Sequence, residues 1–105
     1  MAYEHILTER KGDVLVVTLN RPDRLNAAPP AMFVEIREAL ADLGGARAVL
    51  ITGAGRAFCS GADVGGGALT AADRGLDPGQ ATYDALTGSY NPTLAAIADL
   101  SVPVV

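Results

Sequence analysis

Residues 48–64 have the sequence AVLITGAGRAFCSGADV, in which an uninterrupted apolar run gives way to a glycine-rich segment. The run Ala48–Thr52 shows no alternation of apolar and polar residues, which predicts a central strand covered on both faces. The glycines after it allow backbone N–H groups to approach a ligand closely. Such donors stabilise an oxygen that becomes negative during a reaction. The stretch therefore predicts a buried strand followed by a site for an anion or an oxyanion.

The residues before this strand predict a hairpin and a crossover helix. Ile6–Leu7 and Val14–Leu19 flank the turn residues Lys11–Asp13, as expected for two antiparallel strands. Apolar residues then recur at helical spacing after Pro30, and Gly44–Gly45 interrupt the pattern. The core-facing residues of this helix are Met32, Phe33, Ile36, Leu40 and Leu43. A strand, a helix and a second strand at this distance predict a right-handed βαβ unit and a partly parallel sheet.

The glycine-rich segment predicts a loop that continues to about Gly79. Residues 80–100 return to helical composition, and Asn91-Pro92 favours a break between two helices near Asn91 over a kink in one longer helix. Residues 101–105 begin another apolar strand. A natural domain seldom ends in this manner, so we expect residues 1–105 to be the N-terminal part of a longer domain.

Composition excludes several classes of protein. The chain has 105 residues, half of them apolar and 19% charged, which predicts one small globular domain or part of one. A net charge of -4, without clusters of Lys or Arg, disfavours nucleic acid as a partner. The N-terminus has no continuous apolar run, which predicts neither a signal peptide nor a membrane span. We therefore expect a cytoplasmic protein.

Four local features have simpler explanations than catalysis. Cys59 and His5 are too few soft ligands for a zinc site, and Cys59 lacks a base to activate it. A lone histidine at a strand end is more often a surface or edge residue than a base. Ser60 lacks the glycine two residues earlier that a nucleophile elbow needs. Phe58 stands where a dinucleotide fingerprint requires its third glycine or alanine, which disfavours a nicotinamide site.

Several motifs resemble the crotonase, or enoyl-CoA hydratase/isomerase, family in order and spacing. They are Leu19-Asn20-Arg21-Pro22, Leu25-Asn26-Ala27, the helix after them, Val49–Gly53 and Arg56–Val64, and the resemblance runs from about Ile6 to Val105. It implies an α/β fold of the crotonase type, a spiral of ββα units with a mixed sheet, of which this chain is the N-terminal part.

The same resemblance implies a set of site residues. The backbone N–H at Ala62 matches one of the two oxyanion donors that hold the thioester carbonyl of an acyl-CoA. The residues implied to line the coenzyme A site are Arg24, Leu25, Ala27, Ala57, Gly61, Ala62, Asp63 and Val64, with Arg24 contacting a phosphate. Asp63 matches a position that we interpret as structural, so we do not expect it to be a general base.

The resemblance also implies a reaction class. It implies an enzyme that stabilises the enolate of a CoA thioester, such as an enoyl-CoA hydratase or isomerase, without a metal or redox cofactor and assembled as trimers or hexamers. Tyr90-Asn91-Pro92 and Thr52–Arg56 resemble the ring-epoxide isomerases of phenylacetyl-CoA degradation, which is an alternative. In the family the second oxyanion donor and the acid/base residues follow the strand that begins here at Val102. Two further alternatives are therefore a catalytically incompetent fragment and a relative with hydrolase, dehalogenase or ring-opening activity.

Overall fold

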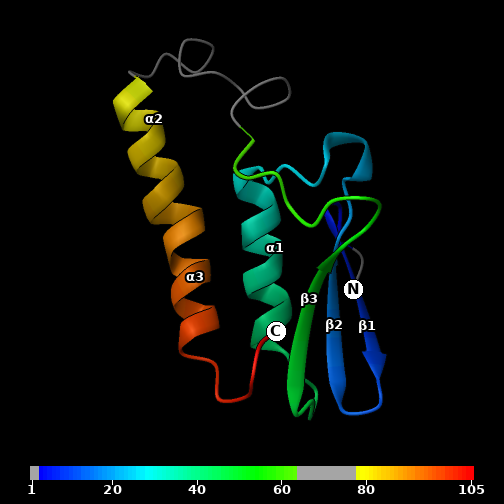
Figure 1. Cartoon of the computed structure of the whole chain (residues 1–105). Helices are drawn as coiled ribbons and strands as arrows, with labels where there is room; N and C mark the ends of the chain where they lie inside the picture. Colours follow the sequence, from blue (N-terminus) through cyan, green and yellow to red (C-terminus); the bar gives the residue numbers. More distant parts are fainter. Residues whose placement is uncertain (1–2, 64–77) are drawn as a thin grey trace.

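The computed structural model describes residues 3–63 and 78–105 (Figure 1). The strands are β1 (Ile6–Lys11), β2 (Val14–Leu19) and β3 (Ala48–Gly53). The helices are η1 (Pro22–Arg24), α1 (Pro30–Ala41), α2 (Pro78–Ala85), the π-helical turn η2 (Leu86–Tyr90) and α3 (Asn91–Ala98). Among the helices in these two ranges, none is long and apolar enough to cross a membrane.

The predicted hairpin and βαβ unit are both confirmed. Strands β1 and β2 are antiparallel and pair from Ile6↔Leu19 to Lys11↔Val14. After the crossover through α1, β3 pairs in parallel with β2, from Val14↔Ala48 to Leu19↔Gly53. The sheet is therefore mixed, with the order β1-β2-β3, and β1, β2 and α1 form one ββα unit.

The last residues of the chain extend this sheet past β3. Val49 donates its backbone N–H to Pro103 at 2.9 Å and accepts a hydrogen bond from Val105 N at 2.9 Å. Val104 thus forms a parallel bridge with Val49, as expected from the apolar residues at 101–105. Strand β3 is flanked on both edges, by β2 on one and by this segment on the other.

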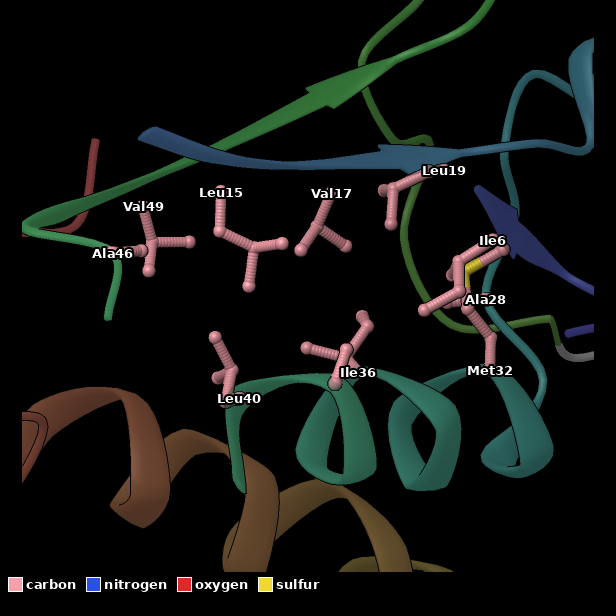
Figure 2. Close-up of a cluster of buried hydrophobic side chains, with 11 residues drawn as sticks. Ile6, Leu15, Val17, Leu19, Ala28, Met32, Ile36, Leu40, Ala46 and Val49 are labelled. Atoms are coloured by element: carbon pink, nitrogen blue, oxygen red, sulfur yellow. The ribbon is translucent and has the colours of Figure 1, made fainter. Parts of the chain in front are cut away.

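One face of the sheet packs on α1 and forms the core. Figure 2 shows Leu15, Val17 and Val49 pointing from the strands toward Ile36 and Leu40 of the helix. All five side chains are buried, as is Met32, because the apolar residues of α1 recur on the side that faces the sheet. Helix α1 ends at Ala41, two residues before the predicted Leu43, and Leu43 instead packs partly buried against the core.

The prediction that β3 is covered on both faces is wrong for the described residues. Val49 is 1% exposed, whereas its neighbour Leu50 is 38% exposed. By the strand register, Leu7 lies on the same face of the sheet as Leu50, and it is 53% exposed. Helix α1 packs on the opposite face only. The apolar run therefore identifies the strand correctly but not the number of its covered faces.

The predicted break near Asn91 is also wrong. Asn91 has helical angles, φ −63° and ψ −44°, and its N–H donates to the carbonyl of Leu86, five residues earlier. This widened turn makes room for Pro92, whose ring in a regular α-helix would clash with the carbonyl four residues before it. The chain from Pro78 to Ala98 therefore continues through η2 without interruption, as the alternative of a kinked helix required (Figure 1).

Two polar contacts fix the helices to the rest of the fold. The fully buried Thr93 shares its single hydroxyl proton between the carbonyls of Phe33, at 2.7 Å, and Ser89, at 2.9 Å, and the contact with Phe33 joins α3 to α1. His5, expected to be a lone surface or edge residue, is partly buried, and its Nδ1 lies 2.7 Å from Oε2 of Glu35. Glu35 also accepts the backbone N–H of His5 at 2.9 Å. This pair anchors the start of the hairpin on α1.

We predict that Met32→Ala lowers the free energy of unfolding by about 2–5 kcal/mol, because it leaves a cavity between α1 and the sheet. Glu38→Ala, at an exposed position of the same helix, is the control and is expected to change stability by less than about 0.5 kcal/mol. Urea unfolding followed by circular dichroism measures both. Equal urea midpoints for Met32→Ala and wild type would contradict this description of the core.

Candidate functional site

Two loops meet at one edge of the sheet. Residues 20–28 follow β2 and residues 54–63 follow β3, and these two strands are parallel. The carboxyl ends of parallel strands lie at the same edge, where α/β proteins place their ligands. Figure 1 shows both loops at that end of the sheet, beside the start of α1.

The side-chain amide of Asn26 joins the two loops. Asn26 is fully buried and has a left-handed backbone, with φ of 56°, a conformation that Asn adopts more readily than most residues. Its Nδ2 donates to the carbonyls of Ala54 at 2.9 Å and Ala57 at 2.8 Å. Its Oδ1 accepts the N–H of Arg21 at 2.7 Å. One buried side chain thus satisfies three backbone groups from both loops.

Backbone hydrogen bonds continue this junction toward residue 63. Ser60 N donates to Leu25 O at 3.0 Å, Ala28 N donates to Gly61 O at 2.8 Å, and Asp63 N donates to Ala28 O at 3.0 Å. The last two bonds form a short parallel bridge between Ala28 and Ala62. The second loop is therefore held along the first by pairing of the kind found in a sheet.

The bridge determines the direction of the Ala62 N–H. Gly61 and Asp63 provide the two hydrogen bonds to Ala28, and backbone groups alternate in direction along an extended segment. The N–H of Ala62 therefore points away from Ala28. Ala62 is exposed, and within residues 3–63 and 78–105 its N–H has no hydrogen-bond acceptor. Gly61 has φ of 120°, a backbone conformation open only to glycine, so the turn before Ala62 depends on this residue.

A second glycine permits the loop after β3 to fold back on the strand. A Cβ added at Gly53 would lie 2.5 Å from the carbonyl oxygen of Phe58 and 2.6 Å from that of Ala57. No side chain fits in this space. The close approach brings Ala57 within reach of the Asn26 amide, so Gly53 and Asn26 together determine the course of the loop.

An ion pair secures the end of the second loop. Arg21 Nη1 lies 3.1 Å from Asp63 Oδ2, and the two side chains are 18% and 11% exposed. The same Nη1 donates to the carbonyl of Ala27. Asp63 is thus paired with a cation at a partly buried position, in agreement with the structural role expected for it.

Tyr90 reaches the same site from the helical segment. Its hydroxyl donates to Ala28 O at 2.6 Å, and its ring meets Phe33 edge to face, with centroids 4.8 Å apart. Burial raises the pKa of the Tyr90 hydroxyl above its usual 10.0, and electrostatic interactions with Asp63 and Cys59 raise it further. The hydroxyl therefore remains protonated, and able to donate, throughout the neutral pH range.

A sequence model of enoyl-CoA hydratase/isomerase matches residues 9–105. The chain belongs to this family. A probable enoyl-CoA hydratase of Rhodobacter capsulatus is 41% identical over 105 residues, which cover 99% of this chain and 38% of the relative. A 1,2-epoxyphenylacetyl-CoA isomerase of Escherichia coli is 35% identical over 108 residues, which cover 97% of this chain and 38% of that protein.

The fold agrees with that of solved enoyl-CoA hydratase/isomerase structures. A crystal structure of a probable enoyl-CoA hydratase/isomerase from Mycobacterium abscessus superposes with a TM-score of 0.75 at 30% identity, and the match covers 96% of this chain and 38% of that one. The chain therefore spans about two-fifths of the length of these relatives. The predicted crotonase-type fold is confirmed for this part of the domain.

The structure brings most of the residues implied by the family resemblance to one place. Leu25 and Ala27 are half-buried in the first loop, Ala57 is half-buried in the second, and the hydrogen bonds described above join the two loops. Gly61 and Ala62 are exposed. Arg24 is exposed in η1. Val64 and the predicted loop at residues 65–77 lie outside the described residues.

Cys59 is half-buried and packs against the core, consistent with a structural thiol. A hollow of about 200 Å³ is lined by Tyr3, Thr8, Leu15, Glu38, Ala39 and Asp42. None of the predicted site residues lines it. In the described part of the chain, no three His, Cys, Asp or Glu residues are grouped closely enough to hold a metal ion.

Three residues that build the site were not predicted from the sequence to do so. Asn26, Arg21 and Tyr90 all lie in motifs quoted for the family resemblance, but their contacts are non-local, up to 62 residues apart. A weak signal was available for Tyr90, because a tyrosine hydroxyl in a packed region needs a hydrogen-bond partner. Nothing in the sequence identifies that partner as Ala28.

We predict that Asn26→Asp destabilises the fold by about 3 kcal/mol or more at neutral pH, because a carboxylate would face two carbonyl oxygens and would be buried with its charge. Asn91→Asp makes the same chemical change at an exposed position and is expected to alter stability by less than about 0.5 kcal/mol. Thermal unfolding measures both variants. A similar small effect for the two would show that the Asn26 amide does not hold the loops together.

The raised pKa of Tyr90 predicts how stability depends on pH. Because the folded-state pKa lies above 10.0, the stability contributed by the protonated hydroxyl is fully present below about pH 10 and is lost as the pH rises through the folded-state pKa. The difference in free energy of unfolding between wild type and Tyr90→Phe should be constant up to about pH 10 and shrink above it.

Urea unfolding over a pH series measures this difference. Tyr83→Phe is the control, since Tyr83 is 62% exposed in the neighbouring helix. The curves for Tyr83→Phe and wild type should remain parallel. If the difference in free energy of unfolding between wild type and Tyr90→Phe grew above about pH 10 instead, the assigned direction of the pKa shift would be incorrect.

Proposed function

We propose that this chain provides the thioester-binding part of an acyl-CoA enzyme, in which the Ala62 N–H is one donor of an oxyanion hole. The observation that carries the proposal is the backbone bridge at Ala28. The bridge uses the carbonyl of Gly61 and the N–H of Asp63, and it leaves the Ala62 N–H directed outward at an exposed position. A donor fixed in this way needs no reorganisation when charge develops on a bound carbonyl oxygen.

The chemistry of such a donor is the stabilisation of an enolate. A thioester carbonyl that accepts hydrogen bonds makes its α-carbon more acidic, and the negative charge of the resulting enolate resides largely on the oxygen. Donors that bind this oxygen more strongly in the transition state than in the substrate lower the barrier. Hydration of an enoyl-CoA and migration of its double bond both pass through this kind of state.

The rest of the substrate would lie along the two joined loops. Leu25 and Ala27 from the first loop, and Ala57, Gly61, Asp63 and Val64 from the second, are the proposed contacts for the coenzyme A moiety. Arg24, which is exposed in η1, is proposed to contact a phosphate. Coenzyme A enters as part of the substrate. We also propose that the reaction needs no metal and no redox cofactor.

We further propose that the acid/base groups belong to the part of the domain that corresponds to the remaining length of the relatives. Asp63 is the carboxylate nearest to Ala62 in sequence, and its charge is paired with Arg21 at 3.1 Å. Asp63 is therefore proposed to position the loop and not to transfer a proton.

A second candidate activity is ring-epoxide isomerisation. It is favoured by the 35% identity to the Escherichia coli 1,2-epoxyphenylacetyl-CoA isomerase. Both activities use the same proposed oxyanion donor, and groups beyond this donor would select between them. We place hydratase or isomerase activity on enoyl-CoA first because the matching family description and the Rhodobacter capsulatus relative name it.

We predict that crotonyl-CoA bound to this chain shows its thioester carbonyl stretching band at lower frequency than in water, because a hydrogen bond from Ala62 polarises the carbonyl. Replacing the Gly61–Ala62 peptide bond by an ester removes this N–H and leaves every side chain in place. Peptide ligation at Cys59 can introduce it. The band should then return toward its position in water, as measured by infrared difference spectroscopy with a ¹³C-labelled carbonyl.

The matched control is the same ligation product with an ordinary peptide bond. A band that stays shifted in the ester protein would remove Ala62 from the oxyanion hole. Activity is tested in a chimaera that joins the remaining residues of the Rhodobacter capsulatus relative after Val105. The chimaera should hydrate crotonyl-CoA and the chain of 105 residues should not, and hydration by the shorter chain would refute the proposed location of the acid/base groups.

A further inference from the structure

The carbonyl of Ala28 receives two hydrogen bonds from distant parts of the chain. Asp63 N donates from the second loop at 3.0 Å, and the Tyr90 hydroxyl donates from the helical segment at 2.6 Å. The first of these bonds is one half of the bridge that directs the Ala62 N–H outward. Tyr90 therefore contacts the acceptor on which the orientation of Ala62 depends.

The helix departs from regular geometry at this residue. Tyr90 is the last residue of the π-helical turn η2, in which the N–H of Asn91 bonds to Leu86, five residues earlier. Single π turns within α-helices are uncommon and occur often at functional sites. Tyr90 lies within this wider turn, so the position of its side chain around the helix depends on the turn.

The surroundings of Tyr90 restrict its side chain. Phe33 packs edge to face against the ring at a centroid distance of 4.8 Å. Thr93, one turn further along, is fully buried and anchors α3 to the carbonyl of Phe33. The phenol thus approaches Ala28 from a helical segment that is packed on α1, and not from a loop.

We infer that Tyr90 is a positioning residue for the oxyanion donor, acting through the Ala28 carbonyl to hold the bridge that aims the Ala62 N–H. This inference rests on the proposed function of Ala62. Tyr90 does not contact the reacting atoms. It fixes the acceptor of the Asp63 N–H, and the peptide between Gly61 and Asp63 takes its orientation from that bond. The hydroxyl remains protonated at neutral pH, because burial and the nearby Asp63 disfavour its ionised form.

The experiment compares Tyr90→Phe with Tyr83→Phe in the complete 105-residue chain. Tyr90→Phe should increase amide hydrogen exchange at Asp63 about 3- to 10-fold, the range expected for loss of one hydrogen bond. With labelled crotonyl-CoA, the shift of the carbonyl band should decrease, whereas affinity for the CoA ester should change by less than about twofold, since the proposed contacts at Arg24, Leu25 and Ala57 lie outside the bridge to Ala28. Tyr83→Phe should change none of these quantities.

The outcomes separate this inference from the proposed function. If wild type shows no carbonyl shift, the proposed function of Ala62 fails. If wild type shows the shift and Tyr90→Phe retains it in full, the positioning role of Tyr90 fails while the function of Ala62 stands. If Tyr90→Phe lowered the affinity for crotonyl-CoA and the shift of the carbonyl band in equal proportion, the role of Tyr90 would be merely structural and the inference would also fail.

A second variant decides the question if Tyr90→Phe does not fold. 3,5-Difluorotyrosine at position 90 keeps the ring and the hydroxyl but ionises at lower pH, and a phenolate cannot donate to Ala28. The carbonyl band of this protein should move back toward its position in water as the pH rises through that ionisation, over a range where the wild-type band is constant. A band that stays constant in both proteins would refute the inference.

Discussion

The candidate site depends on the hydrogen bonds of one buried amide, that of Asn26. Two loops leave the carboxyl ends of β2 and β3, and each exposes carbonyl and N–H groups that a packed site must satisfy. The Asn26 side chain binds Ala54 O, Ala57 O and Arg21 N, so it satisfies groups from both loops at once. An aspartate lacks the two donor protons and a leucine lacks every polar atom, so no residue of similar size replaces it.

The other constraints on the site follow from this junction. Ala57 reaches the Asn26 amide only because Gly53 has no side chain between the loop and the end of β3. The same course of the loop brings Gly61 and Asp63 beside Ala28 and leads to the bridge. Contacts from other elements then secure the bridge, with Arg21 pairing Asp63 and Tyr90 donating to the Ala28 carbonyl. Residues from the two loops, the end of β3 and the helical segment thus determine the direction of one peptide N–H.

Periodicity in the sequence predicted the strands and the first helix because these elements are encoded by near neighbours. Val14–Leu19 is rich in β-branched and apolar residues, and Met32, Ile36 and Leu40 recur on one side of a helix.

The exposed face of β3 could not be predicted, because exposure depends on what packs there and not on the strand itself. Pro92 suggested a break at Asn91, whereas the preceding π turn accommodates its ring. Family resemblance pointed to Ala62, but the contacts of Asn26 and Tyr90 join residues 28 to 62 positions apart, beyond the range of any local pattern.

The proposed donor at Ala62 explains why local chemistry alone does not reveal such a site. A backbone N–H is present at every residue except proline, so the side chain at position 62 need only be small enough to leave it accessible. The sequence requirements fall on the residues that orient it: a glycine at 61 for φ of 120°, and partners for Asp63 and Ala28. In solution, water can satisfy the exposed N–H, so the lack of an acceptor among residues 3–63 and 78–105 costs the free protein little. In the proposed function, the same N–H would meet a thioester oxygen without a rearrangement of the loop, and preorganisation of this kind makes a fixed peptide dipole effective in catalysis.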